Sequence, residues 1–200
     1  TIKYKFQLLA CMGALCVVLI FISGFVYFSN KSEEKAFTLM QAGIKKYKTL
    51  MQTIGPSKAY KEVNPEFEFI LKKYSGKDGG KLARVTYAGI CYQAGEYDQA
   101  ISLYRQSLKD FGDHQPVKHL ALNGLGYSYA AKREYQEAAT YFEKLVSEPG
   151  SIMKDEALFN LGRIYHMLGN SEKSKEFYKK IVSEYPDSIY LELAREKMAG

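Results

Sequence analysis

Cysteine is scarce in this sequence, with three among 200 residues. Cys11 and Cys16 fall within a long apolar run, which leaves Cys91 alone in the polar part of the chain. A single cysteine cannot form a disulfide within that part, so no covalent cross-link stabilises it. The polar part must therefore bury a real hydrophobic core in order to fold.

Blocks of basic residues are also absent, although the formal net charge is +6. Lysine and glutamate are mixed along the chain, a pattern that is typical of a solvated surface. A protein that binds nucleic acid would gather its basic residues on one face or in one stretch. We therefore expect no nucleic-acid partner.

Catalytic and metal-binding patterns are missing as well. His114, His119 and His166 have no cysteine or acidic cluster beside them at the spacing of a metal site. The segment GLGYS has the composition of a phosphate-binding loop, but it lies inside a helical pattern rather than after a strand. No nucleophile and base converge on a recognisable spacing. We expect no metal, no cofactor and no enzymatic activity.

A long uncharged run stands near the start of the chain. No charged residue occurs from Phe6 to Asn30, and the 21 residues from Leu8 to Phe28 are almost wholly apolar. As a helix, such a run spans about 30 Å, the thickness of the hydrocarbon core of a bilayer. Residues 1–30 are thus predicted to form a short end and one transmembrane helix. A cleaved signal peptide is the alternative, but its apolar core is usually shorter and no A-x-A cleavage site follows.

The charges on either side of this run predict its orientation. Lys3 and Lys5 precede it, whereas Lys31 and Lys35 bracket two glutamates after it. Because positive charge favours the cytoplasmic side, the N-terminus is expected in the cytoplasm. The rest of the chain would then lie outside the inner membrane, which is the periplasm in a Gram-negative bacterium.

The polar part contains a pattern that returns after 38 and then 36 residues. ALNGLGYSYAAKREYQEAATYF begins at Ala121, and ALFNLGRIYHMLGNSEKSKEFY begins at Ala157. In an earlier, more divergent copy, Ala88 takes the place of Gly126 and Gly162. A small residue there lets the two helices of a hairpin approach closely, and each hairpin leaves an apolar face that only stacking covers.

These copies resemble the tetratricopeptide repeat (TPR), with its Leu-Gly-x-x-Tyr, then Ala, then an aromatic residue, then Pro. The resemblance covers residues 81–186 as three repeats. It implies an all-α fold, a solenoid of helix hairpins with a concave groove lined by first-helix residues. By register with the repeat, the residues expected to contact a protein partner in the groove are Val85, Tyr92, Asn123, Tyr127, Arg163 and His166.

Residues 31–76, ahead of the three repeats, are predicted to form an amphipathic helix and a degenerate first repeat. The second helix of this unit is expected to begin at Pro65, with Asn64 as its N-terminal cap. The apolar stripe from Phe37 to Ile54 either packs on that helix or forms a coiled-coil seam with a partner or a second copy.

Residues 187–200 follow the repeats and are predicted to contain a capping helix from about Ser188 to Ala199. Its role would be to cover the apolar face that the last hairpin leaves exposed, as terminal helices do in other solenoids.

A cytoplasmic end, one span and an extracytoplasmic repeat domain together resemble the YfgM-type membrane-anchored proteins associated with the Sec translocon. The segment KKYSGKDGGKLARVTYAGICYQAGEYDQA shares this likeness. The resemblance implies a non-enzymatic adaptor whose partners are translocon subunits, periplasmic chaperones or envelope assembly factors. The alternative is a structural component of an outer-membrane or pilus assembly machine. It would form a homo-oligomer through the Phe37–Ile54 stripe or the Ala10-x-x-x-Ala14 pair.

Overall fold

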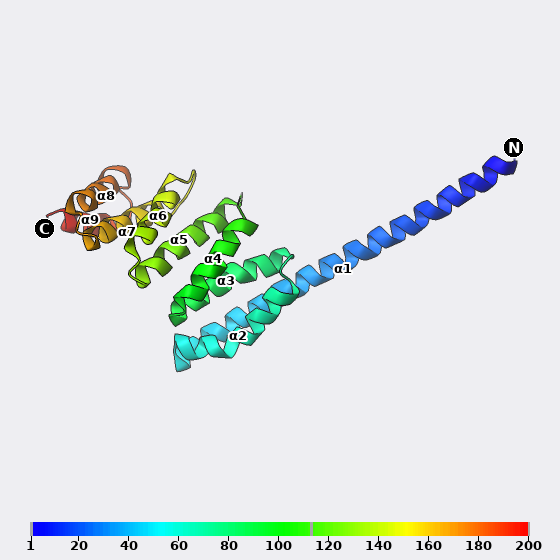
Figure 1. The fold of residues 1–200 in the computed structure, drawn as a ribbon, viewed down its shortest axis with the longest axis horizontal. Coiled ribbons are helices and arrows are strands. Elements are labelled where there is room, and N and C mark those ends of the chain that lie inside the picture. Colours follow the sequence, from blue (N-terminus) through cyan, green and yellow to red (C-terminus); the bar gives the residue numbers. More distant parts are fainter. Residues whose placement is uncertain (1, 113, 200) are drawn as a thin grey trace.

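A computed structural model describes the backbone of residues 2–112 and 114–199, and the side chains of residues 26–112 and 114–199. Within these residues the chain folds into α-helices joined by short turns, and no β-strand occurs. The helices are α1 (Ile2–Ile54), α2 (Pro56–Lys73), α3 (Asp78–Ala94), α4 (Tyr97–Asp110), α5 (Gln115–Ala131), α6 (Tyr135–Ser147), α7 (Lys154–Met167), α8 (Ser171–Glu184) and α9 (Leu191–Ala199). The all-α solenoid expected from the repeats is confirmed (Figure 1).

α1 is a continuous helix of 53 residues. Its N-terminal part extends away from the other helices, while its C-terminal part lies against α2 (Figure 1). The helix ends where Gly55 adopts a φ of 81°, a conformation that suits glycine, and Pro56 then starts α2. Among the described residues, no helix is both long and apolar enough to cross a membrane. The expected span from Leu8 to Phe28 falls mostly on residues 1–25, whose side chains lie outside the described part.

The apolar stripe of α1 packs within the chain. Met40 and Tyr47 are buried, and α1 contacts both α2 and α3. Phe67 of α2 lies so close to Gly43 that a Cβ on the glycine would be 3.0 Å from the ring. This arrangement favours internal packing over a coiled-coil seam, because the central residues of the stripe are already covered.

α2 starts at Pro56 rather than at the predicted Pro65, so the expected cap at Asn64 was wrong. Asn64 lies inside the helix, and its Oδ1 accepts a hydrogen bond from the hydroxyl of Tyr87 in α3. Pro65 is tolerated because it lies on the exposed side of the helix, and the buried face continues past it. That face consists of Ala59, Val63, Phe67 and Ile70.

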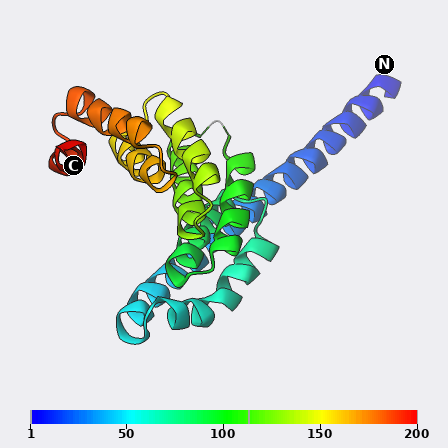
Figure 2. The ribbon, with the colours of Figure 1, turned by 60° about the vertical axis from the view of Figure 1, so that its left-hand side comes forward.

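α3 to α8 form three helix hairpins that stack in chain order (Figure 1, Figure 2). Each helix packs on the next, both inside a hairpin and between hairpins. The turns inside the hairpins reverse the chain through one residue with positive φ: Gly95 at 88°, Arg133 at 63° and Gly169 at 76°. Residues in the left-handed conformation commonly end helices. This conformation has a small steric cost for Arg133 that it does not have for the glycines of the other two repeats.

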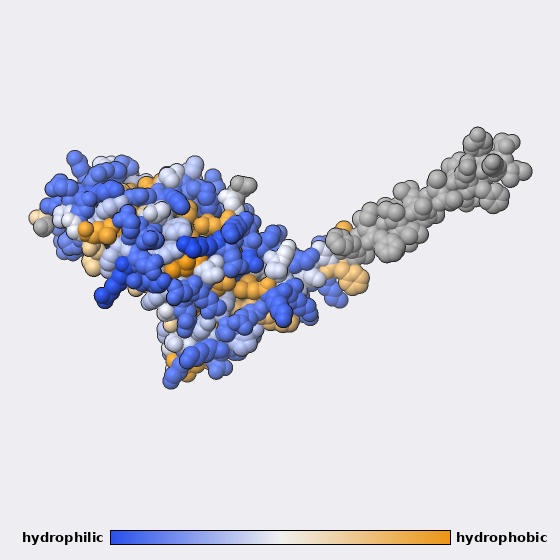
Figure 3. All heavy atoms as spheres, in the orientation of Figure 1, coloured by the Kyte–Doolittle hydropathy of each residue, from blue (hydrophilic) through white to orange (hydrophobic). Residues whose placement is uncertain are grey.

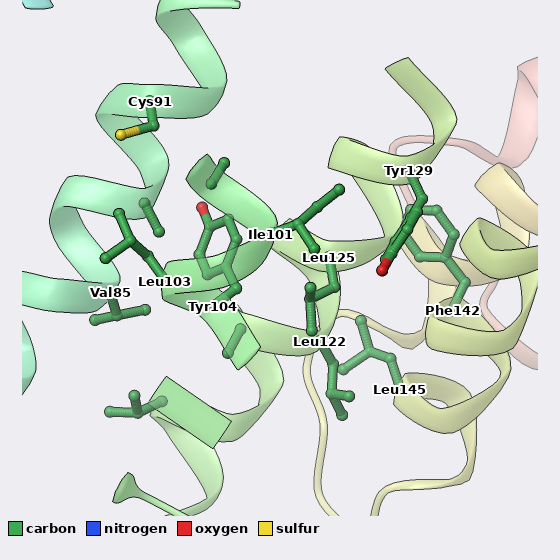
Figure 4. Packing of buried hydrophobic residues seen from close by; sticks show 14 of the residues in the cluster. Val85, Cys91, Ile101, Leu103, Tyr104, Leu122, Leu125, Tyr129, Phe142 and Leu145 are labelled. Carbon is green, nitrogen blue, oxygen red and sulfur yellow. The ribbon is translucent and has the colours of Figure 1, made fainter. Parts of the chain in front are cut away.

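The small residues of the first helices permit the close packing that the repeat predicts. Gly126 lies against the ring of Phe142 in its own hairpin, and Gly162 lies against Tyr178 in the same way. Tyr104 occupies the corresponding position of the first hairpin, but its ring lies against Gly124 of the following hairpin. These side chains belong to one continuous hydrophobic core, part of which is drawn in Figure 4.

The C-terminal helix α9 begins at Leu191, three residues after the predicted start at Ser188. Ser188 instead belongs to the turn, where its Oγ donates a 2.6 Å hydrogen bond to Asp155 Oδ2 at the start of α7. Tyr190, two residues after Ser188, stacks on Phe159 with 4.9 Å between ring centroids. α9 itself packs on α8.

Candidate partner-binding groove

A groove of about 930 Å³ lies along the C-terminal half of the repeats. Side chains of the first helices α3, α5 and α7 form one part of its lining, and side chains of α8 and α9 form another. Hollows on the outer faces of α1 and α4 are smaller, about 330 and 500 Å³. The polar and aromatic side chains that matter most in the groove are Tyr92, Tyr127, Asn160, Arg163, His166 and Lys175.

The repeat register decides which side chains reach this groove. Positions 88, 126 and 162 carry the small residue of each first helix. One position later stand Tyr127 and Arg163, and four positions later stand Tyr92 and His166, all of which line the groove. Residues one and four positions after the small residue lie on one face of a helix, because they are three apart.

Four of the six residues that the sequence selected are therefore brought together, namely Tyr92, Tyr127, Arg163 and His166. The other two lie elsewhere. Val85 is 4 % exposed and belongs to the hydrophobic core, so its expected place in the groove is corrected. Asn123 is 8 % exposed, and its Nδ2 donates to Glu156 Oε1 at 3.4 Å. Both stand three positions before the small residue, on the same helix face as Tyr92 and Tyr127 but closer to the N-terminal end of the helix, where they are buried.

An aromatic wall forms one side of the groove. The rings of Tyr92 and Tyr127 lie 6.1 Å apart between centroids, although they come from different hairpins. Tyr127 also meets Phe142 edge to face at 5.4 Å, which fixes the ring against the core. Tyrosine offers an apolar ring with a polar tip, a combination that is enriched where proteins bind one another.

A chain of hydrogen bonds links the polar residues of the groove to Glu156, which does not itself line it. Arg163 Nη1 donates to Asn160 Oδ1 at 3.3 Å, and Asn160 Nδ2 donates to the hydroxyl of Tyr127 at 2.9 Å. That hydroxyl donates in turn to Glu156 Oε1 at 2.6 Å. Burial, together with the bond to Glu156, raises the pKa of Tyr127, so the hydroxyl stays protonated and keeps its role as a donor.

Sequence reasoning missed Asn160 and Lys175. Asn160 stands two positions before the small residue of its repeat, a position that Gly124 occupies in the preceding repeat. A comparison of the two repeats at this position would have revealed a polar side chain three residues before Arg163, on the same helix face. Lys175 belongs to a second helix, and the first-helix register gave no signal for it.

Positive charge gathers around the groove. Its lining holds Arg163, Lys175 and Lys197 but a single acidic residue, Glu196, whose Oε1 lies 3.9 Å from Lys197 Nζ. Among the described side chains, no carboxylate forms an ion pair with Arg163 or Lys175. Burial raises the pKa of Tyr92, and the charge of Arg163 opposes this shift. The groove is therefore aromatic and cationic.

The histidines do not form a common site. His119 is buried in α5, with its Nε2 4.0 Å from Glu148 Oε2, whereas His166 is exposed at the groove. In the part of the chain whose side chains are described, no three His, Cys, Asp or Glu residues are placed to hold a metal ion.

Comparison with known families finds tetratricopeptide repeats at residues 92–151 and 156–188. Among solved structures, TPR-like repeats of a Podosopora anserina protein described as a kinesin light chain are similar, with a TM-score of 0.66. This match has 14% sequence identity and covers 80% of this chain and 83% of that one. A TPR protein from Parabacteroides merdae has a TM-score of 0.61 at 16% identity, covering 80% of this chain and 59% of that one. At these identities the likeness concerns the fold.

Proposed function

We propose that this chain, whose residues 92–151 and 156–188 form tetratricopeptide repeats, is a membrane-anchored scaffold without enzymatic activity. Its groove would bind a segment of a partner protein. The observation that carries this proposal is the coincidence of a groove of about 930 Å³, an aromatic wall and two cations, Arg163 and Lys175, that pair with no carboxylate among the described side chains. Tyrosine and arginine supply much of the binding energy in protein interfaces, and a concave site lets them act together.

The charge of the groove indicates the chemistry of the bound segment. Arg163 and Lys175 would each gain a carboxylate partner from an acidic segment, and the guanidinium can hold a carboxylate through two parallel hydrogen bonds. Tyr92 and Tyr127 would contact an apolar side chain of the same segment. We therefore expect a segment that carries acidic residues beside at least one apolar residue.

The membrane anchor in this proposal rests on the apolar run from Leu8 to Phe28 and on the continuity of α1 from Ile2 into the repeats. With the N-terminus in the cytoplasm, the run would cross the inner membrane and the groove would face the periplasm. Tethering would raise the effective concentration of the groove for partners at the membrane surface. Translocon subunits, periplasmic chaperones and envelope assembly factors fit this location.

Photo-crosslinking in native membranes tests the proposal. Probes at Arg163 and His166 report on the groove, and a probe at Lys179, which is exposed on α8 but does not line the groove, serves as the control. We expect both groove probes to capture the same partner and the control probe to capture none. Substitution of Lys175→Glu should abolish the crosslink from His166, because the groove then repels an acidic segment.

Two outcomes would contradict this function. Equal capture of the partner from Lys179 would place binding outside the groove. Crosslinks from the groove to a second copy of this chain alone would favour the self-assembling structural role instead.

A further inference from the structure

The turn between α2 and α3 is fixed to α1 at the place where α1 leaves the other helices (Figure 1, Figure 2). Lys77 Nζ donates a 2.6 Å hydrogen bond to Ser29 Oγ. One helical turn further along α1, the carboxylate of Glu33 accepts hydrogen bonds from the backbone N–H groups of Asp78 and Gly79, at the start of α3. The turn therefore has a defined height along α1.

That height coincides with the end of the apolar run. Ser29 directly follows Phe28, and one residue of helix advances about 1.5 Å. The headgroup layer on each side of a bilayer is about 5–8 Å thick. If the run up to Phe28 fills the hydrocarbon core, the ammonium of Lys77 lies within the headgroup layer.

Exposed aromatic residues of α1 lie at this height. Tyr27 and Phe28 are 61 % and 68 % exposed. Figure 3 shows hydrophobic residues on α1 beside the grey N-terminal stretch. Aromatic rings of this kind prefer the boundary between hydrocarbon and water.

A lysine lies over one of these rings. The Nζ of Lys31 is 5.9 Å from the centre of the Tyr27 ring. The nearby acids are engaged elsewhere: Glu33 caps α3, and Asp78 forms a 3.0 Å ion pair with Lys81.

Glu34 and Lys35 are also exposed on α1 and have opposite charges. Among the described residues, no carboxylate pairs with the lysines at positions 31 and 77. The surface around the turn therefore keeps an uncompensated positive charge.

We infer that this surface binds the headgroups of anionic phospholipids, so that the repeat domain docks on the bilayer and does not swing freely from its anchor. We name it the basic collar, and it consists of Tyr27, Phe28, Lys31 and Lys77. The inference rests on the proposed membrane anchor, since the anchor sets the height of the collar. Lysines near an anionic membrane surface are attracted to it, and the aromatic residues add contact with the boundary region.

The test uses the full chain in lipid nanodiscs, with Cys11 and Cys16 replaced by serine. Ser75→Cys places a nitroxide label on the collar turn, and Ser57→Cys places the same label at the other end of α2. Burial raises the pKa of Cys91 to about 12, so this thiol stays protonated and unlabelled near neutral pH. The readout is the access of a water-soluble nickel complex to each label.

We expect nickel access at position 75 to fall in discs that contain phosphatidylglycerol, relative to discs of phosphatidylcholine alone. Access at position 57 should not change. α1 continues for 26 residues from Phe28 to Ile54, about 39 Å of helix, so this end of α2 lies far from the bilayer. High salt should reverse the protection at position 75, because it screens the attraction.

Charge-reversal variants identify the residues responsible. Lys31→Glu with Lys77→Glu should abolish the protection, since each lysine shifts docking on an anionic surface by about fivefold and the pair by about 25-fold. Lys58→Glu with Lys61→Glu makes the same charge change at the far end of α2 and should leave the protection intact. Circular dichroism checks that both variants retain the helical fold.

Different results separate the inference from the proposed function. Chain that floats with the discs but shows no lipid dependence at position 75 overturns the docking and leaves the anchor standing. Chain that fails to float with the discs overturns the anchor and the docking together. Equal protection in phosphatidylcholine alone, or equal loss in the control variant, excludes a specific contact between the collar and anionic headgroups.

Discussion

Gly126 of α5 lies against the ring of Phe142 of α6, so that a Cβ on the glycine would be 2.6 Å from Phe142 Cζ. Real side chains do not approach this closely, and Phe142 is fully buried and unable to retreat. Gly89 of α3 offers a contrast. A Cβ there would meet only the hydroxyl of Tyr104, at 3.5 Å, which is ordinary van der Waals contact.

Gly126→Ala should therefore destabilise the protein by about 1–3 kcal/mol, because an added methyl group in a packed core forces its neighbours to move. Gly89→Ala should have the opposite effect and stabilise by about 0.5–1 kcal/mol, since alanine favours the helix and open space receives it. Denaturant unfolding of both variants, followed by circular dichroism, measures the difference. Equal effects of the two substitutions would contradict the packing described for Gly126.

The small residue of each repeat was also the feature that the sequence predicted best. Its spacing set the register of the three hairpins, and the register placed Tyr127 and Arg163 in one groove. It failed for Val85 and Asn123, which share a helix face with Tyr92 and Tyr127 but lie closer to the N-terminal end of their helices, where they are buried. Spacing alone gives the face of a helix and not whether neighbouring helices cover a side chain on that face.

The start of α2 could not be predicted for a different reason. Asn64 followed by Pro65 is a strong local signal for the beginning of a helix, and propensity arguments favoured it. The structure uses Asn64 inside the helix, where it accepts a hydrogen bond from Tyr87. This partner lies 23 residues away along the chain, so a tertiary contact overrides the local preference.

The ion pair between Arg84 of α3 and Asp110 of α4 gives a second prediction. Arg84 is 8 % exposed and burial lowers its pKa, so the guanidinium depends on its partner. Asp110→Asn should destabilise by about 2–4 kcal/mol, because it leaves a buried charge without compensation. The double variant Arg84→Met with Asp110→Asn should recover much of the loss.

An exposed pair provides the control for this prediction. Glu192 and Arg195 lie 2.7 Å apart in α9 with both side chains largely in solvent. Glu192→Gln should change the free energy of unfolding by less than about 0.5 kcal/mol. A double variant at positions 84 and 110 that is no more stable than Asp110→Asn alone would show that the cost does not come from the stranded charge.

Cys91 gives a prediction about pH. Burial raises the pKa of its thiol to about 12, above the ordinary value of 9.0. Below pH 9.0 the thiol is protonated in both states, so its contribution to stability is fully present. Between pH 9.0 and about pH 12 the Cys91 thiol loses its proton in the unfolded chain and keeps it in the folded chain. The free energy of unfolding therefore falls as pH rises through this range. The slope approaches about 1.4 kcal/mol per pH unit for this one group.

Comparison with Cys91→Ala separates the effect of the thiol on the free energy of unfolding from the effects of tyrosines and lysines that titrate in the same pH range. The variant should lose stability at neutral pH through the missing sulfur atom, but it should lose less additional stability than the parent between about pH 8 and about pH 10. The measurement is the free energy of unfolding of both proteins across that range. Parallel pH profiles would mean that Cys91 ionises equally easily in the folded and unfolded states.

Arg163 separates binding from folding. It is exposed and its hydrogen bond to Asn160 Oδ1 is long at 3.3 Å, so Arg163→Glu should change the free energy of unfolding by less than about 0.5 kcal/mol. In the groove the same substitution places a negative charge where an acidic segment would bind. Affinity for the partner should fall by about 10- to 100-fold or more, since like charges at an interface are costly.

Lys179→Glu makes an equal change of charge on α8 but not in the lining of the groove, and it should leave the affinity within about twofold. Titration of the captured partner against both variants gives the comparison. A loss that is the same in the two variants would reflect the overall charge of the protein rather than a contact with Arg163. A loss confined to Arg163→Glu, without loss of stability, would assign the partner's acidic segment to this groove.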